Sequence, residues 1–358
     1  MPVWECGFCC RYMLLLDDAS DSAKNHQNEE RISTKSPTSF AMNKLNLLEV
    51  REKRVCILMG TFQGERYLLK QLESIRSQTH GYWRLFVSDD GSTDNTLPIL
   101  LDFQASLCPG QMEIFAGPRR GFAANFMSLL LNPSIEGDYF AFCDQDDVWN
   151  MEKLAVAVSS LQSLSDLGKR PAVYGSATIV VDDNLKVLGK SHAACPVPSF
   201  ENALAQNIAG GNTIVLNKKI RELLLKIGNV EIVSHDWWVY LICTGVGGVF
   251  YFDERPEILY RQHTNNLVGT NSSITAQLQR LKQLMHGRYK HWMEINLNAL
   301  ENAKSVLTKE NIAIMEQLAS LRRMPFPLRL VELHRSGIRR QSWQGNLGLF
   351  FACLLNLL

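Results

Sequence analysis

The sequence predicts an α/β protein built on a mainly parallel sheet. Short apolar runs alternate with segments of helical periodicity, and each apolar run ends in a polar loop rich in turn residues. Strands that alternate with helices form parallel sheets with right-handed crossovers, and these sheets bind ligands beyond the carboxyl ends of their strands. We therefore expect the chemistry to lie in the polar loops.

The first strand–loop–helix unit begins at Arg54. Residues 55–59 form a continuous apolar run, residues 61–64 supply turn chemistry, and the following apolar residues recur at helical spacing, namely Leu68, Leu72 and Ile75. The pattern then repeats. Further strands are predicted at 85–87, 113–116 and 139–143, with helices running to Leu107 and over 122–131.

The chain changes character after residue 150. Strands are predicted at 172–181, 212–216 and 257–260, with an edge partner at 184–188, and helices at 218–227 and 237–243. Residues 272–323 are rich in Leu, Gln, Lys and Met and show no strand alternation, which favours helices.

Composition excludes several classes of protein. Hydrophobic residues make up 46% of the 358 positions, so the chain can bury a full-sized core. The 37 basic and 36 acidic residues nearly cancel, which argues against nucleic acid as a partner. Nine cysteines without framework spacing favour reduced thiols in the cytoplasm, and Cys6, Cys9 and Cys10 lack the second ligand pair of a zinc site.

Residues 1–48 are interpreted as a disordered extension. The apolar run at 1–16 is too short for a membrane span, and residues 17–39 are polar and nearly free of large apolar side chains. Met42 lies just before the first organised segment, so an upstream start that is not used in the cell would also explain the extension.

Two of the strand-end loops are strongly acidic. Residues 89–94 read Asp-Asp-Gly-Ser-Thr-Asp, and residues 144–147 read Asp-Gln-Asp-Asp. Two unit charges about 4 Å apart repel by about 4 kcal/mol at an effective dielectric near 20, so such a cluster requires raised pKa values or a cation. Carboxylate and phosphate oxygens are the usual ligands of Mg²⁺ or Mn²⁺ beside a nucleotide. Taken alone, the first loop is better explained as a solvated turn with a helix cap, but its repetition at the next strand end favours the metal.

These motifs together resemble family 2 glycosyltransferases of the GT-A fold. The resemblance rests on their order and spacing over residues 54–266, from Thr61-Phe62 through the two acidic loops. Later segments resemble bacterial rhamnosyltransferases of surface-polysaccharide synthesis. These segments are Asp144 to Trp149, Gly210-Gly211-Asn212, Ser234 to Trp238, and Tyr260 to His263. The resemblance implies a GT-A domain at 49–266 and a helical region at 267–358.

The resemblance also implies roles for individual residues. The nucleotide-sugar donor would be bordered by Thr61, Phe62, Glu65 and Asp144, with Asp89 or Asp90 on the base or ribose, although Asp89 could instead cap its turn. Arg119 or Arg120, with Asn125, would meet the diphosphate or sugar, and Arg261 would neutralise the departing diphosphate. The divalent metal would be held by Asp146, Asp144 and His263, with Asp147 behind them.

The acceptor half is implied in the same way. Gly210, Gly211, Asn212 and Trp237 would border the acceptor, and Asp236 matches the position of the general base, ahead of His235. Asp236 could alternatively stabilise a helix N-terminus capped by Ser234. The expected reaction is an inverting displacement in which Asp236 deprotonates the acceptor hydroxyl. The expected donor is dTDP-rhamnose, or a glucosyl or galactosyl donor, and the expected acceptor is a saccharide, lipid-linked in O-antigen or capsule synthesis.

The carboxyl-terminal segment combines basic and apolar stretches. Residues 325–340 are basic and residues 347–358 are apolar, but the apolar run is too short to span a bilayer. Two interpretations stay open, a helix lying at the inner face of the cell membrane and a helix docked on the domain. Two rival functions also remain. A sugar nucleotidyltransferase would need a basic glycine-rich loop that 60–65 does not supply, and a non-catalytic nucleotide-sugar-binding module cannot be distinguished by sequence.

Overall fold

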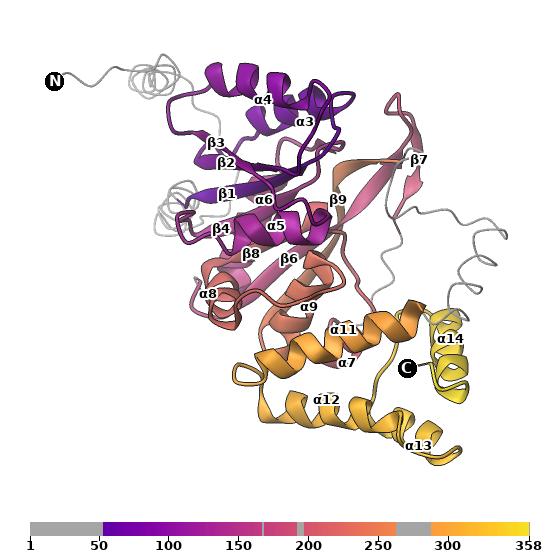
Figure 1. The fold of residues 1–358 in the computed structure, drawn as a ribbon. Coiled ribbons are helices and arrows are strands. Elements are labelled where there is room, and N and C mark those ends of the chain that lie inside the picture. Colours follow the sequence, from indigo (N-terminus) through magenta and orange to yellow (C-terminus); the bar gives the residue numbers. More distant parts are fainter. Residues whose placement is uncertain (1–52, 167, 192–196, 263–287, 358) are drawn as a thin grey trace, which may run out of the picture.

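The computed structural model describes residues 53–166, 168–191, 197–262 and 288–357. The core is a nine-stranded sheet in the order β3-β2-β1-β4-β8-β6-β9-β5, with β7 paired to β6 (Figure 1). Strands β1 (Val55–Thr61), β2 (Trp83–Asp89), β3 (Met112–Ala116) and β4 (Tyr139–Cys143) are mutually parallel. The predicted α/β class is therefore confirmed.

Alternating side chains divide the core between the two faces of the sheet. In β1, Val55, Ile57 and Met59 pack on one face, whereas Cys56 and Leu58 pack on the other. Successive side chains of a strand point to opposite faces, so a continuously apolar strand is one that is covered on both sides. This burial explains why the run shows no polar alternation.

Three helices cover the first face and three cover the second. Buried residues of α3 (Leu68–Arg76), α4 (Thr96–Ala105) and α6 (Lys153–Leu164) join the cluster of Ile57. Buried residues of α5 (Phe122–Leu130), α8 (Lys218–Ile227) and α9 (His235–Gly245) join the cluster of Leu58. The helices predicted between Leu68 and Cys243 are confirmed.

The second half of the sheet is mixed. β8 (Val215–Asn217) is antiparallel to both β4 and β6 (Ala172–Val181), and β9 (Val249–Arg261) is parallel to β6. β7 (Val187–Lys190) forms the predicted edge ribbon, and β5 (Val148–Trp149) pairs with β9. The predicted strand over 212–216 is wrong at its start, because Gly211–Thr213 forms the short 3₁₀ helix η1 before β8 begins.

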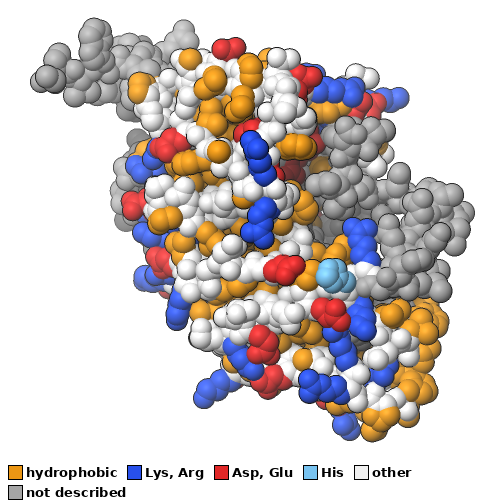
Figure 2. Space-filling view, viewed as in Figure 1, with side chains coloured by type: hydrophobic (Ala, Val, Ile, Leu, Met, Phe, Trp, Pro, Cys, Tyr) orange, Lys and Arg blue, Asp and Glu red, His pale blue; other side chains and the backbone are white. Residues whose placement is uncertain are grey.

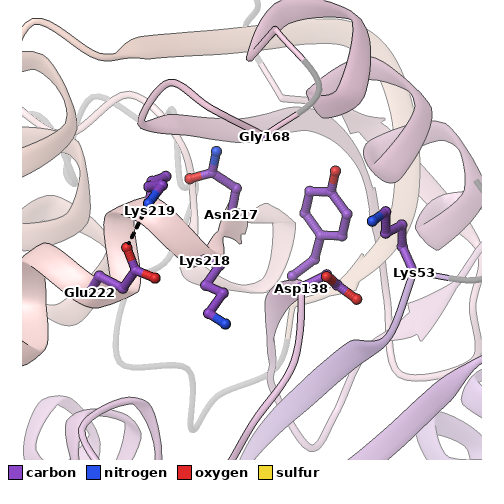
Figure 3. A pocket seen from close by; sticks show the side chains of 8 residues that line it. Lys53, Asp138, Gly168, Asn217, Lys218, Lys219 and Glu222 are labelled. Atoms are coloured by element: carbon purple, nitrogen blue, oxygen red, sulfur yellow. Dashed lines mark hydrogen bonds and ion pairs between the residues drawn. The ribbon is translucent and has the colours of Figure 1, made fainter.

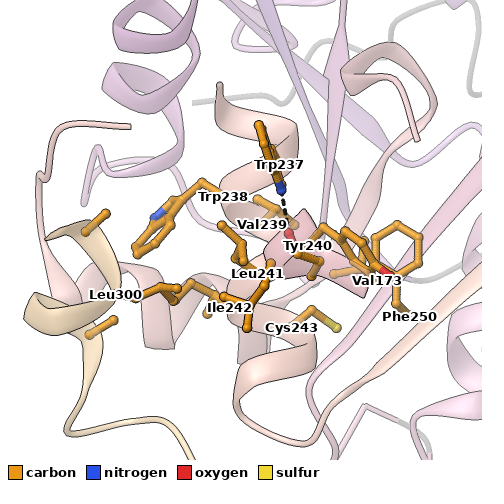
Figure 4. Packing of buried hydrophobic residues seen from close by; sticks show 14 of the residues in the cluster. Val173, Trp237, Trp238, Val239, Tyr240, Leu241, Ile242, Cys243, Phe250 and Leu300 are labelled. Carbon is orange, nitrogen blue, oxygen red and sulfur yellow. Dashed lines mark hydrogen bonds between the residues drawn. The ribbon is translucent and has the colours of Figure 1, made fainter. Parts of the chain in front are cut away.

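The carboxyl-terminal helices lie beyond α9 at the foot of the molecule (Figure 1). They are α11 (Arg288–Ala303), α12 (Lys309–Leu321), α13 (Leu328–Arg335) and α14 (Trp343–Leu354). The Tyr289 hydroxyl of α11 donates to the Ala205 carbonyl of α7 (Phe200–Ala205). Their buried residues belong to the same hydrophobic cluster as α9, which Figure 4 shows packing against Leu300 of α11. The expected boundary at 266 and the extension 1–48 lie outside the described residues, and this division of the chain stays a prediction.

Candidate active site

The two acidic loops leave the sheet at one edge. In the parallel pairing of β1 with β2, Thr61 lies opposite Asp89, and in the pairing of β1 with β4, Met59 lies opposite Cys143. Asp144 follows Cys143 directly. The strand ends after β1, β2 and β4 therefore bring Thr61, Asp89 and Asp144 to the same rim of the sheet.

Asp89 closes its own turn. Its carboxylate accepts hydrogen bonds from the Thr61 hydroxyl at 2.9 Å, from the Ser92 amide at 2.8 Å and from the Ser92 hydroxyl at 2.6 Å. Because the side chain is buried and has several donors, the structure favours the turn-capping alternative for Asp89. Ser92, which sequence analysis did not single out, also accepts a hydrogen bond from the Gln63 amide.

Asp90 links the second loop to the third. Its carboxylate accepts from the Arg119 amide at 2.5 Å and from the Gly121 amide at 3.2 Å. The Arg119 side chain is exposed and crosses Gly91, so closely that a Cβ on Gly91 would lie 2.9 Å from Nε. A glycine with φ of 98° at this position leaves room for the arginine beside the acidic loop.

Asn125 lies beneath these loops. It is buried, and its Nδ2 donates to the Ser88 carbonyl at 2.9 Å, whereas its Oδ1 has no hydrogen-bond partner among the described residues. A Cβ on Gly117 would lie 2.7 Å from both this Oδ1 and an oxygen of Asp90. Two acceptors thus flank one glycine, where a ligand with a donor group would satisfy the unpartnered oxygen.

The loop after β1 is joined to the acidic loop after β4. Gln145 accepts from the Phe62 amide and donates to the Phe62 carbonyl, each at 2.9 Å. Phe62 itself is 55% exposed at the rim. Glu65 has a different role, because its carboxylate accepts from the amide and side chain of Asn95, which precedes α4.

Burial and repulsion between neighbouring carboxylates raise two pKa values in the acidic loop. Burial raises the pKa of Asp144 well above its usual range, and the neighbouring charges of Asp147, Asp146 and Asp236 raise it further. Burial and Asp146 also raise the pKa of Asp147 to about 7, although hydrogen bonds to its carboxylate oppose this shift. A divalent cation would stabilise the ionised forms of these carboxylates, so the residues fit the metal that the sequence implies.

Asp147 anchors the acidic loop from behind. Its carboxylate is buried and accepts from Nδ2 of Asn212 at 2.5 Å and from the Arg261 amide at 3.1 Å. Asn212 was expected against the acceptor. The structure instead commits its amide to Asp147, so that the turn at 210–212 supports the acidic loop.

Arg261 is fully buried under the same loop. Its Nε donates to the Asp146 carbonyl at 2.9 Å, its Nη1 donates to the Asp183 carbonyl at 2.5 Å, and its guanidinium lies 4.5 Å from the centre of the Tyr67 ring. Arg261 was expected to neutralise the departing diphosphate. Its contacts place it behind the loop, where it orients Asp146.

Asp236 begins α9 within electrostatic reach of the acidic loop. It is partly exposed, accepts the Trp237 amide at 2.8 Å, and is one of the charges that raise the pKa of Asp144. The Ser234 hydroxyl makes no capping bond. Asp236 is therefore the acidic residue of α9 that stands beside the predicted metal loop.

His235 points away from the site into the core. Its ring stacks on Phe126 with centroids 4.1 Å apart and meets Phe142 edge-on at 4.6 Å. Neither ring nitrogen has a hydrogen-bond partner among the described residues, and burial lowers the pKa of His235 to about 4. A Cβ on Gly211 would collide with its Nε2, so the glycine allows the turn to pack on this ring.

Trp237 is likewise a core residue. It is 5% exposed and lies among the buried apolar side chains of α9 (Figure 4). Its Nε1 donates to the Ala203 carbonyl at 2.7 Å, and its ring meets Trp292 edge-on. The structure places this ring inside the protein, so the expected contact of Trp237 with an acceptor would require the core to open. Gly210, the first residue of the turn, stays a candidate for the acceptor side.

Two of the three predicted metal ligands, Asp144 and Asp146, lie among the described residues. His263 lies outside them, and within the described residues no group of three or more His, Cys, Asp or Glu side chains is placed to hold a metal.

A separate pocket lies at the opposite end of the strands. It is lined by Lys53, Asp138, Lys218 and Glu222, near the starts of β1 and β4 (Figure 3). Ligands of parallel sheets bind at the carboxyl ends of the strands, so this pocket lies at the wrong edge to serve the acidic loops.

Comparison with known proteins agrees with the fold. The model of the family "Glycosyl transferase family 2" matches residues 56–184, from β1 through the acidic loop to the end of β6. The dTDP-rhamnosyl transferase RfbG of Shigella flexneri is 31% identical over 253 residues, which are 68% of this chain and 84% of the relative. The protein is a glycosyltransferase with a GT-A fold. More narrowly, the chain belongs to glycosyltransferase family 2.

Other relatives lie further away. The UDP-Glc:alpha-D-GlcNAc-diphosphoundecaprenol beta-1,3-glucosyltransferase WfgD of Escherichia coli is 29% identical over 191 residues, 52% of this chain and 68% of the relative. Among solved structures, TarS 1–349 of S. aureus with UDP-GlcNAc aligns at a TM-score of 0.47 and 15% identity, covering 84% of this chain and 81% of TarS.

Proposed function

We propose that this enzyme transfers rhamnose from dTDP-rhamnose to a saccharide hydroxyl with inversion, using Mg²⁺ or Mn²⁺. The proposal rests on one observation above all. A partly exposed carboxylate, Asp236, stands beside an acidic loop whose Asp144 has a strongly raised pKa. In this arrangement Asp236 would serve as the base for the acceptor, and the acidic loop would hold the metal that binds the donor.

The donor would lie across the strand ends. Phe62 would stack on the base, Asp90 and the unpartnered Oδ1 of Asn125 would accept from the base or ribose, and Arg119 would reach the diphosphate. Asp146 and Asp144 would hold the cation, which supplies charge stabilisation to the leaving diphosphate. Asp147, Asn212 and Arg261 would keep this loop in position through the hydrogen bonds described above.

Asp236 would act on the acceptor. Its carboxylate takes the proton from the attacking hydroxyl, the hydroxyl oxygen bonds to the anomeric carbon, and the nucleoside diphosphate leaves from the opposite face. A positioned base of this kind contributes roughly 10²- to 10⁴-fold to the rate.

The similarity to RfbG favours rhamnose as the transferred sugar, and the similarity to WfgD keeps glucose as the second candidate. The polyprenyl acceptor in the name of WfgD supports a lipid-linked saccharide acceptor, which would place the enzyme at the cytoplasmic face of the membrane in surface-polysaccharide synthesis.

Donor hydrolysis and transfer test the proposal. Purified enzyme would be incubated with Mn²⁺, a lipid-linked saccharide and either dTDP-rhamnose or UDP-glucose, and released nucleoside diphosphate would be measured. We expect acceptor-dependent release with dTDP-rhamnose. Release with UDP-glucose but not with dTDP-rhamnose would show that glucose is the transferred sugar. Donor binding without any release of nucleoside diphosphate would favour a non-catalytic module.

A further inference from the structure

The carboxyl-terminal helix α14 is apolar on two sides. Leu349, Ala352 and Cys353 are buried against the rest of the protein. Large apolar side chains are nevertheless exposed along the other side, namely Trp343 (73%), Leu347 (47%), Phe350 (43%), Phe351 (46%) and Leu355 (57%). We call these five residues the α14 stripe.

The spacing of the α14 stripe makes it one continuous surface. The intervals from Trp343 are four, seven, eight and twelve residues, which is the repeat that lines up side chains on one face of an α-helix. Figure 2 shows hydrophobic side chains gathered at the corner of the molecule where α13 and α14 lie. Exposed Phe326, Leu328 and Val331 of the adjacent segment add to the apolar character of this region.

The surroundings of the stripe carry positive charge. Residues 322–358 contain six arginines and one glutamate. Arg329 is buried and donates to backbone carbonyls, but Arg323, Arg335 and Arg339 are exposed. Basic side chains also border the hydrophobic corner in Figure 2. An apolar helix face that includes an exposed tryptophan, with arginines beside it, has the chemistry of a helix that lies in the headgroup region of an anionic bilayer.

The helix cannot be a membrane span. In the part of the chain that the structure describes, every helix is too short or too polar to cross a bilayer. At 1.5 Å rise per residue, the twelve residues of α14 would extend only about 18 Å, well short of the roughly 30 Å hydrocarbon core. A bilayer that binds this apolar stripe would therefore have the helix lying parallel to its surface.

The stripe is also connected to the acceptor side of the protein. Gln206, at the end of α7, accepts from Nε of Arg340 at 3.1 Å and from the Gln341 amide at 3.3 Å, and the Arg339 carbonyl accepts from Asn202. The segment that leads into α14 is thus fixed to the chain just before Gly210-Gly211. These bonds fix the chain before α14 to Gln206, which lies four residues before Gly210 of the proposed acceptor side.

We infer that the α14 stripe docks the enzyme on the surface of an anionic phospholipid bilayer. Trp343, Leu347, Phe350, Phe351 and Leu355 would enter the interface, and Arg323, Arg335 and Arg339 would meet the phosphate headgroups. The inference deepens the proposed function by holding the enzyme beside a lipid-linked acceptor. Its test measures membrane binding alone.

Vesicle flotation of the full chain tests this docking. Wild type is mixed with vesicles of phosphatidylcholine alone or of phosphatidylcholine with phosphatidylglycerol. We expect wild type to float with the anionic vesicles, and Trp343→Ser/Leu347→Ser/Phe351→Ser to lose about tenfold or more in partitioning. The matched control replaces three exposed leucines elsewhere, Leu69→Ser/Leu101→Ser/Leu188→Ser, and should float like wild type.

A second variant tests the attraction between the arginines and the anionic headgroups. Arg335→Glu/Arg339→Glu should reduce flotation with anionic vesicles, and high salt should reduce wild-type flotation in the same way. The milder Trp343→Ser variant gives a second measurement should the triple variant not fold, and should show a smaller loss. Turnover of a water-soluble acceptor should be unchanged in every well-folded stripe variant, so membrane binding and glycosyl transfer can fail separately.

Two outcomes would overturn the inference. One is equal flotation of wild type and the folded stripe variant. The other is a wild type that does not float but sediments as a dimer, with the stripe variant a monomer, which would assign the α14 stripe to a second copy of this chain.

Discussion

At the scale of single residues, Asp236 and Asp144 are two carboxylates of one site that have different surroundings. Burial raises the pKa of Asp144 well above its usual range, and three acidic neighbours raise it further. Asp236 stands at the start of α9, partly exposed, with the Trp237 amide as its donor. We assign Asp144 to the metal because a cation would stabilise its ionised form, and Asp236 to the acceptor because it is partly exposed beside the acidic loop.

Asp236→Asn should separate catalysis from donor binding. The amide keeps the shape of the side chain but cannot take a proton, so turnover should fall by roughly 10²- to 10⁴-fold. Donor affinity, measured by calorimetry with the nucleotide sugar and Mn²⁺, should stay within about twofold of wild type. Loss of donor binding in parallel with turnover would show that Asp236 belongs to the donor site.

Asn212→Leu should weaken the acidic loop from behind. The substitution leaves the buried carboxylate of Asp147 without its 2.5 Å donor, which should destabilise the protein by about 1–3 kcal/mol and raise the metal concentration needed for half-maximal activity. The matched control is Asn298→Leu on the exposed side of α11, where the stability change should remain within about 0.5 kcal/mol. Denaturant unfolding and metal titration of activity would measure both effects, and a variant with unchanged metal dependence would remove Asn212 from the supporting set.

Some site residues were predictable from the sequence and others were not. Asp89, Asp90, Asp144 and Asp146 could be placed at one edge, because the carboxyl ends of parallel strands lie at the same edge of a sheet. The hydrogen bonds from Asn212 and Arg261 to Asp147 were not predictable, because they join segments that lie far apart in the sequence. Tyr67 was missed for the same reason, since only the fold brings its ring against Arg261.

At the scale of elements, the start of α9 joins the active site to the core. Two successive residues point in different directions, with His235 inside the aromatic cluster of Phe126 and Phe142 and Asp236 at the site. The η1 turn packs on the same histidine at Gly211. The position of the proposed base therefore depends on an imidazole that is held neutral by burial.

The pH dependence of stability should reflect this histidine. The folded pKa of about 4 lies below the ordinary 6.5, so as pH falls from 6.5 to 4 the unfolded chain takes up a proton that the folded chain does not. His235 therefore removes up to about 3 kcal/mol of stability over that window and has no effect of this kind above it. Denaturant unfolding at pH 7 and pH 4.5 should show a loss about 2–3 kcal/mol smaller for His235→Leu than for wild type. Equal losses would mean that His235 titrates normally in the folded protein.

Element boundaries were predictable where the side-chain pattern was strong. Ala172–Val181 and Lys218–Ile227 were predicted with the bounds that the structure has, because a long β-rich run and a strongly amphipathic helix leave little choice. The start of β8 was mispredicted because Gly211–Thr213 is turned by packing on His235 and by the bond from Asn212 to Asp147, and neither is visible in a local pattern.

At the scale of the whole molecule, one rim of the sheet carries the loops to which we assign the donor. These loops follow the parallel strands β1, β2 and β4, and Asp236 at the start of α9 is the residue that we propose for the acceptor. The sequence indicated this assignment through the order of its motifs. The packing of the carboxyl-terminal helices into the same hydrophobic cluster as α9 was not predictable, since it depends on how α11 to α14 are arranged in space.

The central claim is that the crowded carboxylates hold a dication together with the donor diphosphate. Calorimetric titration of dTDP with and without Mn²⁺ into wild type and Asp146→Ala tests it most directly. We predict that Mn²⁺ tightens dTDP binding to wild type by at least about tenfold, and that Asp146→Ala abolishes this gain without unfolding. Equal dTDP affinity with and without Mn²⁺ in wild type, or a full Mn²⁺ effect in Asp146→Ala, would contradict the account.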